Sequence, residues 1–270
     1  MLYTGFGIPM PAKEALRLAD ERRREIVKIL RSEGRVSVED LAGRFKVSTV
    51  TLRTDLSQLA QKGALVRSYG GAILPVVPNE LSLSVKATID HSEKARIGER
   101  AAQFIRSHQT IILDSGTTTA EIAKAIKAAK PAALTVITHA VNIAQEFADA
   151  PNISVIVIGG IMRHVSGSCV GPQAERMIRE LHADHFFLGV DGLSANNELS
   201  TPDLLEAQLN AVMIEAAQEV TVVADASKIG RRSLSVIGNL SRIHRLITDS
   251  RASSAALDAI RSSGVEVVVV

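Results

Sequence analysis

Three segments near the N-terminus carry apolar residues at helical spacing. The first covers about residues 20–32, with a polar face formed by residues 21–24. The second begins at Ser37. The third begins at Ser48, a residue type that is preferred as a helix N-cap. The apolar stripe of the third segment consists of Leu52, Leu56 and Leu59. This pattern predicts three consecutive helices.

A hairpin pattern follows the three helices, at residues 64–74. Residues 65–69 alternate as a strand does, and Gly70-Gly71 is suited to supply positive φ at the turn. Three helices followed by a hairpin are typical of a winged helix-turn-helix, a small DNA-binding domain.

The rest of the chain alternates between strand-like and helix-like segments. The strand-like runs are rich in Val, Ile and Leu and lie at 110–113, 134–137, 153–158, 185–190, 220–224, 245–247 and 265–270. Helical patterns between them include 92–107, 120–129, 174–181 and 204–217. Such alternation predicts the α/β fold class, with a mostly parallel sheet covered on both faces.

These patterns divide the chain into four parts. We expect an N-terminal extension at 1–17, a winged helix-turn-helix at 18–74, a linker at 75–90 and a larger α/β domain at 91–270. The linker is placed where Pro75 and Pro78 interrupt both helix and strand patterns.

The distribution of charge supports a DNA-binding role for the small domain. Residues 1–75 hold 13 Lys and Arg against 8 Asp and Glu, a net charge of +5, whereas the remaining residues carry −3. The chain has one cysteine, Cys169, and no apolar run long enough to span a membrane. No basic segment precedes the short apolar stretch 1–10, so it does not resemble a secretory signal. We therefore expect a soluble cytoplasmic protein.

The exposed side of the third helix is the candidate DNA reader. With its leucines facing inward, Val50, Thr51, Arg53 and Thr54 point outward near the start of the helix, where a recognition helix meets base edges. The helix start itself favours a phosphate, and the wing lies beside it. We expect DNA contacts from Ser48, Thr49, Arg67 and Tyr69 there. A solvated basic face, or a module that binds another protein, is the alternative.

A second candidate site follows the strand at 110–113. The chain continues as Asp114-Ser115-Gly116-Thr117-Thr118-Thr119 and then enters a helix. Gly116 allows close approach of the backbone, the threonines offer hydroxyls, and the helix start offers N–H groups, which together suit an anion. The string is neither a Walker A loop nor a dinucleotide fingerprint. A threonine-rich turn that caps a helix is the structural alternative.

Other polar groups follow strands in the same way. Parallel strands present their carboxyl ends at one edge of a sheet, so these groups are expected to share a cleft with Asp114. Arg163 and Lys228 would offset a phosphate, and Asp114, Asp191 and Glu206 could accept hydroxyls of a sugar. The further members of this group are His139, Gly159 and Gly160. The histidines lack metal-ligand spacing, so we expect neither a metal nor a cofactor.

Taken together, the N-terminal residues resemble the DeoR family of bacterial transcriptional regulators. The resemblance rests on Glu21-Arg22-Arg23, Val47-Ser48, Thr51-Leu52-Arg53-Thr54-Asp55-Leu56 and Gly70-Gly71-Ala72, and it continues through the second domain. Thr54 and Tyr69 depart from the basic residue and the histidine usual in the family. Because both side chains are expected to meet DNA, the operator sequence does not carry over from a relative.

The same resemblance extends to the second domain, which it likens to ribose-5-phosphate isomerase-like folds. It implies a phosphorylated sugar as effector, bound at positions matching Asp114, Gly116 to Thr119, Gly159-Gly160, Asp191-Gly192, Glu206 and Lys228. His139 and Glu198 depart from the usual Asn and Gly and alter the shape of the pocket. Residues 47–51 and 69–74 look most like the amino-sugar (N-acetylgalactosamine) branch.

The resemblance implies a repressor that is not an enzyme and that leaves its double-stranded DNA operator when the effector binds. A homodimer or homotetramer is expected, because one recognition helix covers one half-site. The alternative is a sugar-phosphate isomerase or deaminase with an accessory DNA-binding domain, in which Asp114, Glu206 and Lys228 would serve as acid/base groups.

Overall fold

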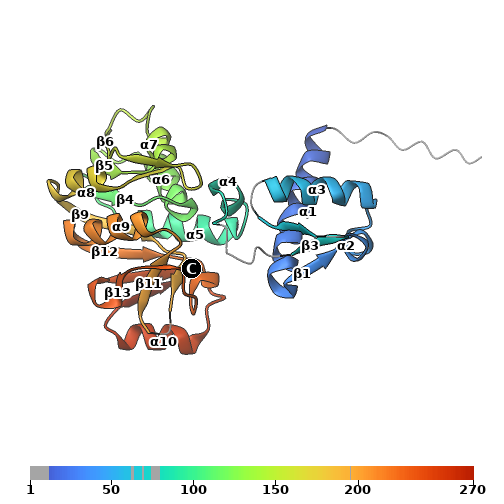
Figure 1. Cartoon of the computed structure of the whole chain (residues 1–270). Coiled ribbons are helices and arrows are strands. Elements are labelled where there is room, and N and C mark those ends of the chain that lie inside the picture. Colours follow the sequence, from blue (N-terminus) through green and yellow to red (C-terminus); the bar gives the residue numbers. More distant parts are fainter. Residues whose placement is uncertain (1–11, 62–63, 69, 74–79, 195) are drawn as a thin grey trace, which may run out of the picture. The chain divides into compact units, whose positions relative to one another are not determined.

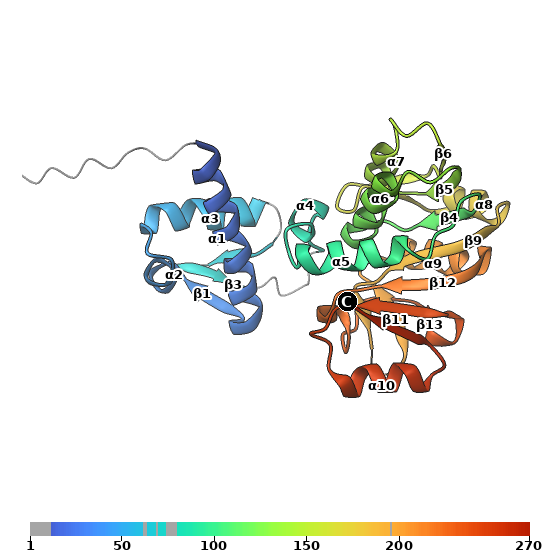
Figure 2. The same cartoon turned by 180° about the vertical axis from the view of Figure 1, so that it is seen from behind.

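The computed structural model describes residues 12–61, 64–68, 70–73, 80–194 and 196–270. Within it the chain divides into two compact units, Met1–Ile89 (unit 1) and Asp90–Val270 (unit 2). Figures 1 and 2 show the two units from opposite sides. No helix among the described residues is long and apolar enough to cross a membrane.

Unit 1 consists of helices packed on a small antiparallel sheet. The three predicted helices are observed as α1 (Ala12–Glu33), α2 (Val38–Phe45) and α3 (Thr49–Gln61). The first begins earlier than predicted, so residues 12–17, expected to belong to an N-terminal extension, are part of α1. Ser37 caps α2, since its Oγ accepts the Asp40 N–H at 3.0 Å. The sheet has the order β1-β3-β2, formed by Arg35–Ser37, Gly71–Ile73 and Val66–Ser68. The hairpin β2–β3 was predicted; β1 was not, because three residues are too few to show a period.

The two glycines of the hairpin have different functions. Gly70 has a φ of 74° and forms the turn, as predicted. The prediction of positive φ at Gly71 is wrong. Gly71 lies in β3 opposite Ser37, and a Cβ there would collide with the carbonyl oxygen of Val36. It is the close approach of β1, and not the turn, that requires glycine at this position.

Unit 1 has its own hydrophobic core. Ile26 and Leu30 of α1 pack with Leu41 of α2 and with the leucine stripe of α3. Residues 80–89, inside the interval expected to be a linker, contain the short helix α4 (Leu83–Lys86). Val85 and Ile89 belong to the core of unit 1. This part of the expected linker is therefore packed, because it carries apolar residues at helical spacing after the prolines.

Unit 2 is built on a seven-stranded parallel sheet with the order β15-β14-β12-β9-β4-β5-β6. Each strand coincides with one of the seven predicted runs. In chain order they are β4 (Thr110–Leu113), β5 (Leu134–Thr138), β6 (Ile153–Val157), β9 (Ala183–Gly189), β12 (Ala217–Val223), β14 (Arg245–Thr248) and β15 (Glu266–Val269).

Helices cover both faces of this sheet, as predicted. Neighbouring residues of one strand belong to different hydrophobic clusters: Phe186 and Ile112 face one layer, and Phe187 and Ile111 face the other. The helices of unit 2 are α5 (His91–Ala102), α6 (Thr117–Ala129), α7 (Val141–Glu146), α8 (Pro172–Arg179), α9 (Leu204–Ala216) and α10 (Ser254–Ser262).

Two smaller β elements were not predicted. A hairpin is formed by β7 (Ile161–Arg163) and β8 (Ser168–Val170), and an antiparallel sheet by β10 (Gly192–Leu193), β11 (Glu198–Thr201) and β13 (Ser235–Asn239). Short helical turns lie at Ala226–Lys228 (η1) and Leu240–Arg242 (η2). Both β elements follow strands of the main sheet and carry polar residues of the candidate effector site.

Candidate functional site

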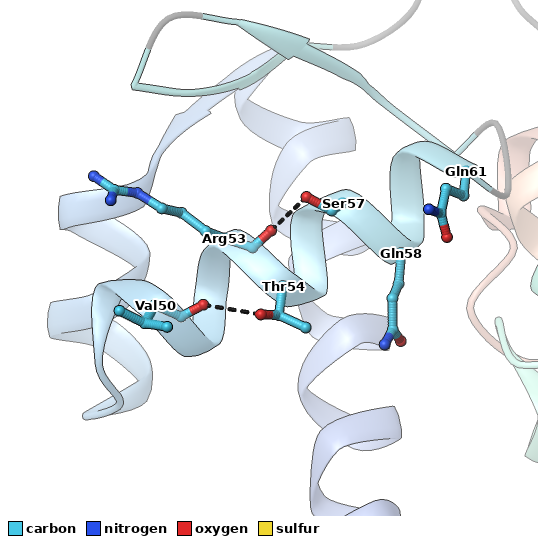
Figure 3. A pocket seen from close by; sticks show the side chains of 6 residues that line it. All are labelled: Val50, Arg53, Thr54, Ser57, Gln58 and Gln61. Atoms are coloured by element: carbon cyan, nitrogen blue, oxygen red, sulfur yellow. Dashed lines mark hydrogen bonds between the residues drawn. The ribbon is translucent and has the colours of Figure 1, made fainter.

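The outer face of α3 is exposed, as a recognition helix requires. Leu52 and Leu56 are fully buried, whereas Val50 keeps 68% of its surface exposed. A shallow hollow of about 520 Å³ lies along this face and is lined by Val50, Arg53, Thr54, Ser57, Gln58 and Gln61 (Figure 3). The last three were not predicted, although they continue the same helical face toward the C-terminal end of α3.

The hydroxyls at the start of α3 are engaged within the helix. Ser48 Oγ accepts the Thr51 N–H at 3.1 Å and lies 2.9 Å from Thr51 Oγ1, which confirms the N-cap. Thr54 Oγ1 donates to the carbonyl oxygen of Val50 at 3.1 Å. The arginine fork of Arg53 is therefore the strongest donor on the exposed face (Figure 3).

Arg67 lies where it joins the wing to the recognition helix. Its Nη1 donates to the carbonyl oxygen of Arg53 at 2.9 Å and to Ser57 Oγ at 3.1 Å. Through Nη1, Arg67 holds β2 against α3, and the contact of Arg67 with DNA stays a prediction. Tyr69, the other predicted wing residue, lies outside the described residues.

A buried carboxylate on the inner side of α3 was missed. Asp55 is 1% exposed and accepts hydrogen bonds from Arg22 Nε at 2.6 Å and Arg23 Nε at 2.8 Å. The polar face expected at residues 21–24 is thus partly an internal contact with α3. The sequence contained a signal for the burial of Asp55, since this residue stands three positions after Leu52 and four before Leu59 and therefore shares their face of the helix.

In unit 2, the loop after β4 leads directly into α6. Gly116 precedes the helix with a φ of 129°, and the threonines at 117–119 form the first helical turn. Thr118 and Thr119 are buried, and Thr119 Oγ1 donates to the carbonyl oxygen of Gly116 at 3.1 Å. The first N–H groups of a helix lack intrahelical acceptors, so this turn can offer donors to an anion.

Asp114 is the centre of a buried polar cluster. Its Oδ1 accepts the Ser115 N–H at 2.7 Å, and its Oδ2 accepts the Gly189 N–H at 3.0 Å and Asn210 Nδ2 at 3.4 Å. Burial raises the pKa of Asp114 well above its usual value, and the nearby Glu206 carboxylate adds to the rise. A site that keeps such a carboxylate buried is a functional candidate.

His139 faces Asp114 without a hydrogen bond. The ring is fully buried, and its Nε2 lies 3.6 Å from Asp114 Oδ1. Burial, assisted by the charge of Arg163, lowers the pKa of His139 to about 4, so the imidazole is neutral. Neither ring nitrogen has a hydrogen-bond partner among the described residues, and Asn210 Oδ1 also has none. Buried polar atoms without partners are the groups that a ligand would satisfy.

Arg163 and Glu206 form a second part of the cluster. Arg163 Nη1 lies 2.6 Å from Glu206 Oε1, and its Nε lies 3.2 Å from Asp203 Oδ2. Ser168 Oγ donates to Glu206 Oε1 at 2.7 Å. The charge of Arg163 thus balances carboxylates within the cluster, and its predicted contact with a phosphate stays a prediction.

Lys228 and Asp191 form a third part. Lys228 Nζ lies 3.1 Å from Asp191 Oδ1, and the two side chains are 22% and 23% exposed.

Gly160 lies in the turn that follows β6. It has a φ of 158°, and a Cβ there would lie 2.6 Å from the carbonyl oxygen of Val170. Gly160 therefore allows close packing against Val170 of β8, whereas a Cβ at Gly159 would meet no atom within 4 Å.

The structure thus brings Asp114, His139, Arg163 and Glu206 together, as the strand-end argument predicted. Sequence reasoning missed Asn210, which lies one helical turn after Glu206 on α9. It also missed the hydroxyls that bind Arg163 and Glu206, which are Ser166, Ser168 and Thr201. Among the described residues, no group of three or more His, Cys, Asp or Glu could hold a metal ion.

Comparison with protein families gives matches over both units. Residues 22–76 match the DeoR-like helix-turn-helix domain, and residues 89–250 match the DeoR C terminal sensor domain.

Individual relatives agree with this result. A putative aga operon transcriptional repressor of Escherichia coli O157:H7 is 38% identical over 253 residues, covering 93% of each chain. The HTH-type transcriptional regulator GlpR of Haloferax volcanii is 35% identical, covering 93% of this chain and 98% of its own. These relatives are named as regulators, which confirms the expectation of a non-enzyme. A ribose 5-phosphate isomerase from Methanocaldococcus jannaschii superposes with a TM-score of 0.39 at 16% identity, over 52% of this chain and 55% of its own.

Proposed function

This chain belongs to the DeoR family of transcriptional regulators, and we propose that it is a repressor released from its operator by a phosphorylated sugar. The proposal rests on the presence of two features in one chain. Unit 1 has an exposed recognition face on α3, and unit 2 has a buried polar cluster at the carboxyl ends of its parallel strands. Sugar hydroxyls can both donate and accept, which suits the unpartnered atoms of His139 and Asn210. The repressor acts in the cytoplasm on a sugar-related operon.

The DNA-binding part of the proposal depends on Arg53. We expect Arg53→Ala to lose specific operator binding, since it removes the bidentate donor at the N-terminal half of α3. Lys28→Ala is the matched control, because Lys28 is an exposed cation of α1 that pairs only with the neighbouring Glu25 among the described residues. Fluorescence anisotropy with a labelled operator measures both. Wild-type operator affinity in Arg53→Ala would remove α3 from the interface.

The effector part depends on Lys228, the partly exposed cation at this edge of the sheet. A phosphate would compete with Asp191 for Lys228 Nζ and would be offered further donors by the start of α6. We expect a phosphorylated sugar or amino sugar to raise the melting temperature of the wild-type protein, because it binds the native state. Lys228→Ala should keep operator binding and lose the response. A normal response in that variant would exclude Lys228 from the site.

We further propose that the repressor is a homodimer or homotetramer. A single recognition helix covers one half-site, and two helices are needed to read an operator with two-fold symmetry. Apolar side chains remain exposed on the edge strand β6 and on β7, where an interface between copies would cover them: Ile156, Val157, Ile161 and Met162. Light scattering of the full chain tests the proposal, and a monomer at operator-binding concentrations would contradict it.

A further inference from the structure

We propose that Arg251 positions Asp90, the residue at which the chain leaves the linker interval and enters unit 2 (the exit of the linker), according to the state of the effector site. In this way Arg251 couples sugar binding to DNA release. The inference rests on the proposed effector site and assigns it a route of transmission. Arg251 lies just after β14, outside the polar cluster around Asp114. Its guanidinium joins two carboxylates, Asp249 and Asp90, that belong to different parts of unit 2.

The first carboxylate is directly connected to the effector loop. Asp249 is fully buried, and its Oδ2 accepts the Ala226 N–H at 2.7 Å. Ala226 begins η1, which ends at Lys228. The turn is internally fixed, since Asp225 accepts the N–H groups of Ser227 and Lys228 at 3.0 Å each. A ligand that engages Lys228 and the N–H groups of this turn would act on an element whose first N–H is held by Asp249.

Arg251 holds the same carboxylate from the other side. Its Nε donates to Asp249 Oδ1 at 2.7 Å and its Nη2 donates to Asp249 Oδ2 at 3.1 Å, a bidentate pair. Burial alone would raise the pKa of Asp249, but the hydrogen bonds from Arg251 and from the Ala226 N–H outweigh it and lower the pKa. The carboxylate is therefore charged and fixes the guanidinium in one orientation.

The remaining donor of Arg251 reaches the point where the chain enters unit 2. Nη1 donates to Asp90 Oδ1 at 2.7 Å, and Glu93 Oε1 lies 3.8 Å away. Asp90 is the first residue of unit 2 and immediately follows Ile89, a core residue of unit 1. Its φ of 51° is in the left-handed region, which costs a residue other than glycine free energy. The ion pair with Arg251 stabilises this conformation at the exit of the linker.

These contacts form a continuous chain from Lys228 through Ala226, Asp249 and Arg251 to Asp90. Its last link joins residues 161 positions apart in sequence. A guanidinium can serve both carboxylates because its donors form a planar fork, and a lysine ammonium in its place could not keep the bidentate pair and reach Asp90. A contiguous path is evidence of coupling only when a perturbation of the path changes the coupling.

The test measures the coupling factor, which is the ratio of operator Kd with and without effector. The probes are glucose 6-phosphate, galactosamine 6-phosphate and glycerol 3-phosphate, and the one that raises the wild-type melting temperature most is used. Arg251→Gln breaks both contacts. Asp90→Asn breaks only the exit contact and keeps the left-handed backbone, because asparagine tolerates that conformation. Arg242→Gln is the matched control, since Arg242 is an exposed arginine paired with Glu215.

We expect Arg251→Gln and Asp90→Asn to bind the probe and the operator as the wild type does, but to lose at least roughly fivefold of the coupling factor. Arg242→Gln should keep the wild-type factor. A purely structural function of Arg251 would lower the melting temperature without changing the coupling. Wild-type coupling in both variants, or loss of probe binding in either, would overturn the proposal. A wild type that responds to none of the probes refutes the effector site itself, and the proposed coupling with it.

Discussion

Asp55 of α3 is held by Arg22 and Arg23 of α1, and we call this set of ion pairs the clamp between α1 and α3. The clamp can be tested by replacing Asp55 with alanine. Asp55 is buried, and the two arginines that donate to it, Arg22 and Arg23, retain 15% and 17% of their side-chain exposure. Breaking a buried ion pair by removal of one partner costs about 3–5 kcal/mol. Because both guanidinium groups can reach some water, the lower end, about 3 kcal/mol, applies here. Alanine returns roughly 0.5 kcal/mol through its higher helix propensity.

The net loss expected for Asp55→Ala is therefore about 2.5 kcal/mol in the free energy of unfolding of unit 1. A domain of this size has a total of roughly 5–10 kcal/mol. At the lower end of that range about 2.5 kcal/mol would remain, which corresponds to roughly 1–2% of unit 1 unfolded at equilibrium. With a denaturant slope of about 1 kcal/mol per molar urea, the midpoint should fall by roughly 2.5 M.

The measurement needs a readout that distinguishes the two units. Hydrogen exchange of the full chain at increasing urea, read by mass spectrometry of its peptides, follows the backbone amides of unit 1 and of unit 2 separately. We expect the transition of the α1 and α3 peptides to shift in Asp55→Ala and the transition of unit 2 to keep its midpoint.

Asp20→Ala is the matched control. Asp20 pairs with the same Arg23, at 3.0 Å, but is 54% exposed, so its loss should cost less than about 1 kcal/mol. If Asp55→Ala shifts the midpoint no more than Asp20→Ala does, the two arginines contribute no more to a buried carboxylate than to an exposed one. The clamp would then not stabilise α3.

Three further predictions concern other parts of the molecule. Gly98→Ala should destabilise unit 2 by about 1–3 kcal/mol in calorimetry, since a Cβ would lie 2.7 Å from Glu121 backbone; an unchanged melting temperature would contradict this. Burial lowers the pKa of His139 and His185 to about 4. The unfolded state therefore binds more protons below the usual histidine pKa of about 6.5, and lowering the pH from about 7.5 to 5.5 should cost roughly 1.4 kcal/mol for each histidine. The raised pKa of Asp114 acts in the opposite direction, so the measurement compares the wild type with His139→Asn, which should lose roughly 1.4 kcal/mol less stability over this window. Equal pH dependence in the two proteins would refute the assignment. Finally, Arg53→Ala should reduce the slope of log affinity against log salt by about 1 if Arg53 neutralises a phosphate, and leave it unchanged if Arg53 contacts a base alone.

The periodicity of apolar residues was sufficient to predict most of the regular structure. All seven runs of Val, Ile and Leu became strands of one parallel sheet, and Ser37 and Ser48 cap the helices they were expected to cap. These features depend on residues that are close together in the sequence. The spacing of apolar residues shows which face of a segment is buried, and it therefore distinguishes a helix from a strand.

Elements without a long pattern escaped prediction. The strands β1, β7, β8 and β10 are only two or three residues long, and each is held by its partner strand across the sheet. Gly71 could not be interpreted from its neighbours in the sequence for the same reason. Only glycine fits at this position because the backbone of Val36, on another strand, lies too close for a Cβ.

The sequence by itself determined the two domains, the parallel sheet and the residue types at its carboxyl edge, because local spacing encodes which face is buried. Only the tertiary structure decided how the polar groups pair. Arg22 and Asp55 are 33 positions apart, Asp114 and Asn210 are 96, and Arg251 and Asp90 are 161. A charged side chain looks like surface until the fold brings its partner to it, since burial of a charge is tolerated only where an opposite charge and hydrogen bonds meet it.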